Sequence, residues 1–260
     1  MSTEIMSKNF NTFGIAENSA VVHDQYMVSV FCSTYNQRKY IKTCLDSLVN
    51  QKTNFKYEII VKDDASTDGQ QEIIKQYAEN YPDKVIPLLL EINHFSRGLG
   101  RVVTEKFMKI SRGKYIAFCE GDDFWTDENK LQTQVDFMEA HPECSLCGHA
   151  AYYANEDGTL RHDKCFRHVE ESRYLSTEEL IEKWMMATNS TMYRKSAKID
   201  VVIPYQGKCV NGDYATLIYF SLKGKVYFLN KLIGTNLFFA LVAMFYSILR
   251  YGMTQSPLMY

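Results

Sequence analysis

The chain has 260 residues, of which 46% are hydrophobic and 23% charged, and this composition excludes a disordered or collagen-like protein. Its 29 basic and 31 acidic residues leave a formal net charge of -2, which argues against a general nucleic-acid binder because such proteins carry an excess of Lys and Arg. At this length we expect one enlarged domain, or one domain with appendages.

The first half of the chain alternates short apolar runs with helical periods. Strands are predicted at 27–32, 57–61, 85–90 and 115–119. Helices with one apolar face are predicted at 41–48, after the turn at 68–69, at 103–110 and at 131–141, and Pro82 ends the second of them. This alternation predicts an α/β fold with a mainly parallel sheet and helices on both faces. Ligands of such sheets bind beyond the carboxyl ends of the strands.

The second half is less regular. Residues 158–175 are polar and read as a loop, and Ser176 to Glu179 form a capping box that opens a helix. A further helix is predicted at 213–223, followed by a short strand at 225–229.

The C-terminal segment is apolar. Residues 237–249 carry no charge, but 13 residues are fewer than the about 20 that a membrane-spanning helix needs. Two interpretations of 232–250 stay open, a core or interface helix and a membrane-surface element between Lys231 and Arg250.

The seven cysteines are scattered and odd in number, and a chain of this size does not need disulfide bonds, so we predict free thiols in a reducing compartment. Residues 1–27 hold no apolar stretch typical of a signal peptide, which also predicts a cytoplasmic location. A structural zinc site is the alternative for some of these residues, although no second cysteine pair stands at a zinc-finger spacing. Its ligands would come from Cys144, Cys147, His149, His162, Cys165 and His168.

Acidic residues follow two predicted strands and precede a late helix. They are the pairs Asp63-Asp64 and Asp122-Asp123, and Asp213. Each alone is consistent with a turn or helix cap. Together they converge on one crevice, where their repulsion requires a partner. Mg²⁺ or Mn²⁺ suits such oxygen ligands, and the metal in turn suits a diphosphate.

Four ordered blocks of sequence resemble family 2 glycosyltransferases of the GT-A fold. The likeness runs from Met27 to about Asn230, and its blocks are Val28–Asn36 (VSVFCSTYN), Cys44–Gln51 (CLDSLVNQ), Glu58–Gly69 (EIIVKDDASTDG) and Gly113–Trp125 (GKYIAFCEGDDFW). The resemblance implies a nucleotide-binding half at 27–125 and an acceptor half at 126–230. Residues 1–26 are then an N-terminal extension and 231–260 an atypical apolar tail.

The resemblance also implies roles for single residues on the donor side. Ser33, Thr34 and Tyr35 would cradle the nucleotide base, and Asp64 would bind the pyrimidine edge. Asp122 would contact the ribose or the sugar. Asp123 would ligate a Mn²⁺ or Mg²⁺ ion that bridges the two phosphates.

On the acceptor side, Asp213 stands where the family has its general base. Trp125 is expected to stack on a sugar ring, and Asn189 and Ser190 belong to a stretch similar to the one that lines the acceptor. Separately, Arg97 or Arg101 in the loop after the third strand could pair with a phosphate, and a solvated loop charge explains either equally well.

The expected function is metal-dependent, inverting transfer of a sugar from a nucleoside diphosphate, with UDP as the default, to a polysaccharide or lipid-linked acceptor in bacterial-type surface glycan synthesis. The tail could hold the protein at the inner face of the membrane through 232–250. The segment after Asn230 lacks the Arg/His-containing string common in the family. The competing hypothesis is therefore a catalytically weak nucleotide-sugar binding or scaffold protein with a disrupted C-terminus.

Overall fold

The computed structural model describes residues 26–164, 169–197 and 212–237. The strands are β1 (Val28–Thr34), β2 (Tyr57–Asp63), β3 (Val85–Leu89), β4 (Tyr115–Phe118), β5 (Cys144–Ala154), β6 (Leu160–Lys164), β7 (Arg173–Leu175), β8 (Met192–Arg194) and β9 (Lys225–Leu237). The helices are α2 (Arg38–Val49), α3 (Gln70–Asn80), α4 (Gly100–Ile110), α5 (Lys130–Ala140), α6 (Thr177–Glu182) and α7 (Gly212–Ser221), with 3-10 turns η2 (Thr188–Ser190) and η3 (Lys195–Ala197).

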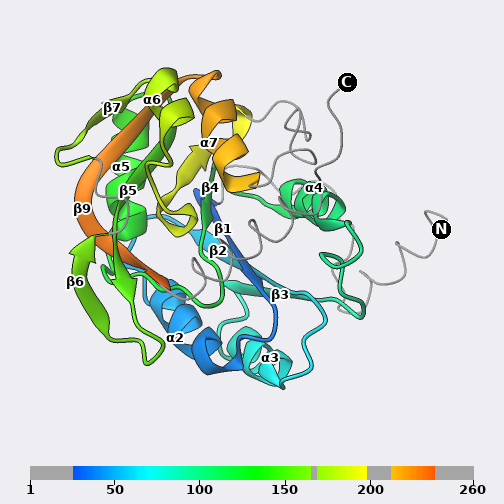
Figure 1. Cartoon of the computed structure of the whole chain (residues 1–260). Coiled ribbons are helices and arrows are strands. Elements are labelled where there is room, and N and C mark those ends of the chain that lie inside the picture. Colours follow the sequence, from blue (N-terminus) through cyan, green and yellow to red (C-terminus); the bar gives the residue numbers. More distant parts are fainter. Residues whose placement is uncertain (1–25, 165–168, 198–211, 238–260) are drawn as a thin grey trace, which may run out of the picture.

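The described strands form one mixed sheet in the order β3-β2-β1-β4-β8-β5-β9-β7, and β6 pairs with the C-terminal end of β5, beyond the residues that pair with β8 (Figure 1). The first four strands of this order are mutually parallel, as the strand–helix alternation predicted. Short β8 is antiparallel to both of its neighbours, and it joins the parallel block to the β5–β9 pair, which is again parallel. The predicted α/β class is confirmed.

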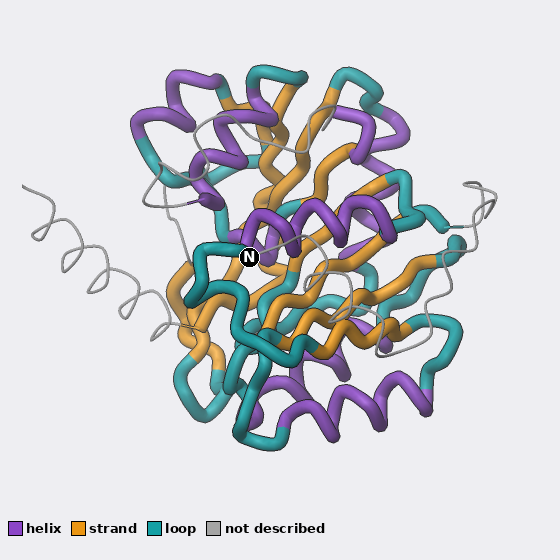
Figure 2. The backbone as a smooth tube through the Cα atoms, turned by 90° about the vertical axis from the view of Figure 1, so that its right-hand side faces the viewer, coloured by secondary structure: helices purple, strands orange, loops and turns teal. Residues whose placement is uncertain are grey.

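Helices cover both faces of the sheet (Figure 2). One core cluster packs α2, α3 and α5 against one face, and a second cluster packs α4, α6 and α7 against the other. Strand β1 serves both clusters, because Val28, Val30 and Cys32 point to the first face and Phe31 to the second. Burial on both sides explains why β1 and β2 are nearly continuous apolar runs.

The expectation that residues 158–175 form a loop is wrong, because β6 and β7 lie there, each paired with a longer strand. Such strands have one neighbour only, so backbone hydrogen bonds can order them without an apolar sequence. The predicted capping box of α6 is confirmed, since Ser176 and Glu179 bond reciprocally.

Strand β9 is much longer than the predicted strand at 225–229. Residues 232–237 are its second half, paired with β5, so they do not form the core or interface helix considered from sequence, and as a sheet strand they are not a separate membrane-surface element. The boundary placed after Asn230 falls inside this strand. Residues 238–250 lie outside the described residues. None of the described helices is long and apolar enough to cross a membrane.

A buried ion pair closes the amino end of the parallel strands. Glu58 on β2 is 0% exposed and accepts hydrogen bonds from the Ser29 hydroxyl at 2.5 Å and from the Arg112 backbone N–H at 2.7 Å. The Arg112 guanidinium lies 2.6 Å from the same carboxylate. These contacts join β1, β2 and the loop before β4, and they leave the carboxyl ends of the strands as the open side of the sheet.

Glu58→Gln is expected to lower the free energy of unfolding by about 2–3 kcal/mol, because it leaves buried donors facing an amide in place of a carboxylate. Glu72→Gln, at an exposed carboxylate paired with Lys75, is the control, with an expected loss below about 1 kcal/mol. Urea denaturation of both variants measures the difference. Equal losses would contradict a structural role for the buried pair.

Candidate active site

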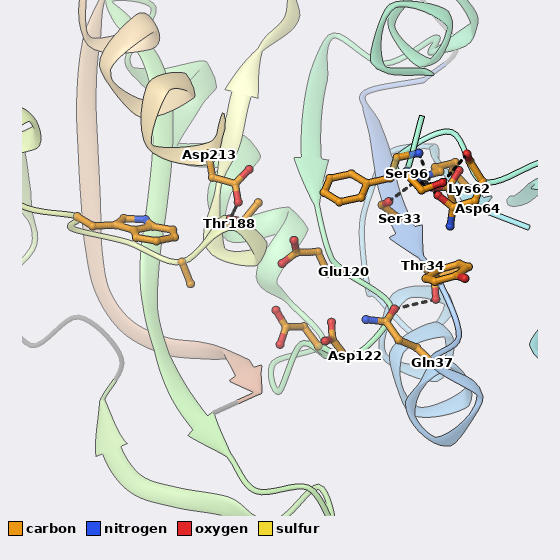
Figure 3. A pocket seen from close by; sticks show the side chains of 16 residues that line it. Ser33, Thr34, Gln37, Lys62, Asp64, Ser96, Glu120, Asp122, Thr188 and Asp213 are labelled. Carbon is orange, nitrogen blue, oxygen red and sulfur yellow. Dashed lines mark hydrogen bonds and ion pairs between the residues drawn. The ribbon is translucent and has the colours of Figure 1, made fainter. Parts of the chain in front are cut away.

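A cavity of about 470 Å³ opens at the carboxyl ends of β1, β2 and β4 (Figure 3). Its walls come from segments that are distant in sequence, because every loop that leaves these strands turns into the same space. The described residues that line it are Ser33, Thr34, Tyr35, Gln37, Lys62, Asp64, Asn93, Phe95, Ser96, Glu120, Asp122, Asp123, Trp184, Ala187, Thr188 and Asp213.

One end of the cavity is formed by the loop that follows β1. Tyr35 is 47% exposed and offers a ring at the rim. The Thr34 hydroxyl donates to Gln37 at 2.8 Å, and this bond holds the first turn of α2 against the strand end. An exposed aromatic ring beside small polar side chains can contact a planar base.

Asp64 and Lys62 form the floor beside this loop. The Asp64 carboxylate accepts the backbone N–H groups of His94 and Phe95, both at 3.0 Å, and thereby fixes the loop after β3. The Lys62 ammonium lies 3.5 Å from Asp64 and 3.4 Å from the Ser33 hydroxyl. Burial lowers the pKa of Lys62, which the neighbouring acids partly oppose. Floor and loop together present both a carboxylate and a hydrogen-bond donor to a ligand.

The neighbouring Asp63 has a different task. It is 0% exposed and does not line the cavity. Its carboxylate accepts from the Ser66 backbone N–H and from the amides of Gln70 and Gln71. The first acid of this pair therefore organises the loop into α3, and only Asp64 lines the cavity.

The acid loop, residues 120–126, brings three carboxylates into the cavity beside the loop that follows β1, and Figure 3 shows Glu120 between Thr34 and Asp213. Burial raises the pKa of Glu120 well above its ordinary value, and Asp213, Asp123 and Asp122 raise it further. Burial also raises the pKa of Asp122. The loop lies tightly against β1, because a Cβ on Gly121 would stand 2.4 Å from the Thr34 hydroxyl. Glycine is thus required between the acids.

Asp213 enters from the second residue of α7 and faces the acid loop (Figure 3). Thr188 in η2 donates a hydrogen bond to its carboxylate at 2.8 Å. Burial raises the pKa of Asp213, and the Thr188 bond opposes that shift. A carboxylate of raised basicity in a cavity can accept a proton from a hydroxyl group.

The cavity is strongly acidic. Five carboxylates line it, those of Asp64, Glu120, Asp122, Asp123 and Asp213, whereas Lys62 is the one cationic side chain among its described lining residues. No three His, Cys, Asp or Glu residues of the described part stand as a complete metal-ligand set. Of the residues named for the zinc alternative, Cys165 and His168 and the side chain of His162 lie outside the described part. The donor set still fits Mg²⁺ or Mn²⁺, since these ions take one or two carboxylates and complete their shell with phosphate oxygens and water.

The structure gathers most of the residues predicted from sequence at this cavity. Lining it are Ser33, Thr34, Tyr35, Asp64, Asp122, Asp123 and Asp213. Arg97 is exposed and does not line it, and the side chain of Arg101 lies outside the described part. Asn189 and Ser190 are both 0% exposed and lie behind the cavity wall.

Trp125 does not occupy the sugar-stacking position expected for it. It is 4% exposed, its indole N–H donates to the Asn189 carbonyl at 3.0 Å, and the Lys130 ammonium lies 3.8 Å from the ring centre. A ring packed in this way has no face left for a sugar. Trp184, 59 residues further along the chain, lines the cavity instead.

Nine of the described residues that line the cavity were not among the predicted site residues, and Lys62, Glu120 and Trp184 are three of them. Lys62 and Glu120 stand within the blocks that carry the resemblance, so their position next to the strand ends was a usable signal. Trp184 lies in irregular chain between α6 and β8, where periodicity indicates no direction for a side chain. Thr188 is the first residue of the stretch that resembles the acceptor side, so the resemblance was a usable signal for it.

Comparison with known proteins places this site in a family context. The family model described as Glycosyl transferase family 2 matches residues 29–201. An uncharacterised protein of Mycobacterium tuberculosis is 38% identical over 174 residues, which cover 66% of this chain and 48% of that protein. TuaG of Bacillus subtilis, named for teichuronic acid biosynthesis, is 35% identical over 112 residues, covering 43% of this chain and 42% of TuaG. The chain thus spans about half the length of these relatives.

Solved structures share the fold at low sequence identity. The crystal structure of S. aureus TarS 1-349 in complex with UDP has a TM-score of 0.61 at 21% identity, covering 86% of this chain and 63% of that one. The mannosyltransferase PcManGT from Pyrobaculum calidifontis, in complex with GDP-Man and Mn²⁺, has a TM-score of 0.57 at 12% identity, covering 84% and 59%. At these identities the likeness shows the fold alone.

Thr188→Val should raise the pKa of Asp213, because it removes a hydrogen-bond donor to the ionised carboxylate. If Asp213 is the base, the acid limb of the profile of kcat/KM against pH shifts to higher pH in this variant.

The exposed carboxylate of Glu128, paired with Lys52, gives the control Glu128→Gln, for which no shift is expected. An unchanged acid limb in Thr188→Val would contradict the assignment.

Proposed function

Because the chain belongs to glycosyltransferase family 2, we propose that it transfers a sugar from a nucleoside diphosphate donor, by default a UDP-sugar, to an acceptor hydroxyl with inversion. The observation that carries this proposal is the single cavity in which the β1 loop and Asp64 face the acid loop and Asp213. The nucleotide base, the diphosphate and the sugar of such a donor need neighbouring binding sites in that order.

The nucleoside would lie at the end formed by Ser33, Thr34 and Tyr35. Asp64 accepts hydrogen bonds and Lys62 donates them, so the floor suits a base edge that carries both an N–H and a carbonyl, such as uracil. The TarS structure, which contains UDP, supports this choice of nucleotide.

The diphosphate would lie over the acid loop, with Asp122 toward the ribose or sugar and Asp123 toward a divalent cation. Mn²⁺ or Mg²⁺ would stabilise the negative charge that develops on the leaving phosphate. The surplus of carboxylates in the cavity supports a cation there, because bringing in a diphosphate alone would add further like charge. The Mn²⁺ ion of the PcManGT complex supports the same choice.

Asp213 would act as the general base that accepts the proton of the acceptor hydroxyl. Its raised pKa makes it a better proton acceptor, and Thr188 keeps the carboxylate turned toward the acid loop. One base and one held leaving group suffice for a single displacement, so the anomeric configuration inverts and no nucleophilic carboxylate is needed.

For the acceptor we propose a surface glycan or its lipid-linked precursor, which the name of TuaG supports. We also propose a cytoplasmic location, supported by the free thiols of Cys32, Cys44, Cys119, Cys144 and Cys147. Membrane contact through the tail is retained only for 238–250, because 232–237 belong to β9.

The decisive test is calorimetric titration of the purified protein with UDP, in the presence of Mn²⁺ and in EDTA, together with a screen for donor hydrolysis. We expect Mn²⁺-dependent UDP binding and hydrolysis of one donor, and Asp123→Ala should abolish the metal-dependent binding. Normal affinity and full metal dependence in Asp123→Ala would reject the metal assignment. Binding without any turnover would favour the nucleotide-sugar binding or scaffold hypothesis.

Asp213→Asn should retain UDP binding but lower the rate of transfer by about 10²-fold or more, because the amide cannot accept the acceptor proton. Single-turnover kinetics at saturating donor measures this loss separately from binding. A fully active Asp213→Asn enzyme would remove Asp213 as the base.

A further inference from the structure

The back of the acid loop is attached to the second half of β9. The Thr126 N–H donates to the Ile233 carbonyl at 3.2 Å, and the Thr235 N–H donates to the Phe124 carbonyl at 2.9 Å. The Thr235 hydroxyl also bonds both backbone groups of Phe124. Trp125 and Gly234 also form an antiparallel β-bridge. The position of the loop therefore depends on β9.

Asn189 links this attachment to the carboxylate assigned to the cation. Its side-chain amide donates to Asp123 Oδ2 at 2.8 Å and also to the Thr235 backbone carbonyl. Asn189 is 0% exposed and Asp123 is 2% exposed, so solvent does not compete for these bonds. The bond to Oδ2 sets the plane of the Asp123 carboxylate and hence the direction of its other oxygen.

Trp125 and Lys130 hold Asn189 from behind. The indole N–H of Trp125 donates to the Asn189 backbone carbonyl at 3.0 Å. The Lys130 side-chain nitrogen lies 3.8 Å from the centre of the Trp125 ring, is 0% exposed and has no hydrogen-bond acceptor among the described residues. Burial lowers the pKa of Lys130 to about 7, whereas contact with the ring face favours its charged form and fixes the ring in return.

This region contains an unusual share of unpaired polar atoms. Of the five buried side-chain nitrogen and oxygen atoms without a partner among the described residues, four belong to Lys130, Gln134, His149 and Asn189. Burying such groups lowers stability, and an apolar residue in place of Lys130 would avoid that loss. Residues that lower the stability of the fold are expected where they contribute to a functional site.

From these contacts we propose that Asn189 is a positioning residue for Asp123, and that Trp125 and Lys130 hold Asn189 in place for that role. The inference rests on the proposed metal-dependent function, because it concerns the orientation of the carboxylate that would face the cation. Groups that hydrogen-bond a ligating carboxylate set its direction, and their loss typically lowers metal affinity about 10- to 100-fold.

A merely structural role for Asn189 predicts a different result. Loss of a buried amide would then lower the melting temperature without changing how much metal the protein needs. Ser145→Ala is a matched control, because its buried hydroxyl bonds the Phe220 and Lys225 carbonyls away from the cavity. It removes comparable polar contacts from the core and leaves the acid loop untouched.

The experiment measures the Mn²⁺ concentration that gives half-maximal UDP binding, the UDP affinity at saturating Mn²⁺, and the melting temperature. Asn189→Ala should raise the Mn²⁺ requirement about 10- to 100-fold and leave UDP affinity at saturating Mn²⁺ unchanged. Trp125→Phe, which removes the indole N–H but keeps an aromatic ring beside Lys130, should raise the requirement by less. Ser145→Ala should lower the melting temperature alone.

Lys130→Met should raise the Mn²⁺ requirement while the melting temperature stays equal or rises. A lower melting temperature with an unchanged requirement would make Lys130 a packing residue and overturn its part in the inference. An unchanged requirement in Asn189→Ala would overturn the whole inference. If Asn189→Ala does not fold, an unchanged Mn²⁺ requirement in Trp125→Phe would overturn the whole inference.

Failure of the proposed function gives a different outcome. Wild-type protein that binds UDP equally well in EDTA would remove the metal role, and the positioning role would fall with it. If UDP binding by the wild type depends on Mn²⁺ but the variants differ from it only in ways that do not depend on Mn²⁺, the positioning role alone is overturned.

Discussion

Mutual repulsion among carboxylates is the constraint on which the site depends. The acid loop and Asp213 bring four of them into one small cavity, and burial raises the pKa of Glu120, Asp122 and Asp213. Ionised acids persist in such a place only where donors or cations face them. Thr188 supplies a hydroxyl to Asp213, and Asn189 supplies an amide to Asp123. A cation, together with the contacts of a bound sugar donor, would balance the remaining negative charge.

The buried charged groups at the two ends of the parallel strands differ in how they are paired. At the amino end, Glu58 is fully paired with Arg112 and Ser29, so the strands are joined by satisfied buried groups. At the carboxyl end, the loops turn outward and carry acids that repel one another. Rigid strands anchored at one end can hold unfavourable groups at the other, which is how a site is kept in place at a cost in stability.

Local pattern predicted the parallel half of the fold well. The strands and helices of residues 27–141 were located because buried parallel strands are continuous apolar runs and the helices show one apolar face. The local pattern did not predict β6, β7 and the second half of β9, because pairing with a distant strand, rather than the local sequence, determines the structure there. The apolar run from residue 232 onward looked helical because length and hydrophobicity alone do not distinguish a buried strand from a helix.

The sequence by itself determined the α/β class, the family resemblance and the acids at the strand ends, because these depend on residue order and on where a strand stops. Only the tertiary structure decided which tryptophan faces the cavity and what lies behind Asp123. Trp125 is held by Asn189, 64 residues away, and Phe124 by Thr235, 111 residues away. Contacts at such separations depend on how sheet and loops pack, and no local period records them.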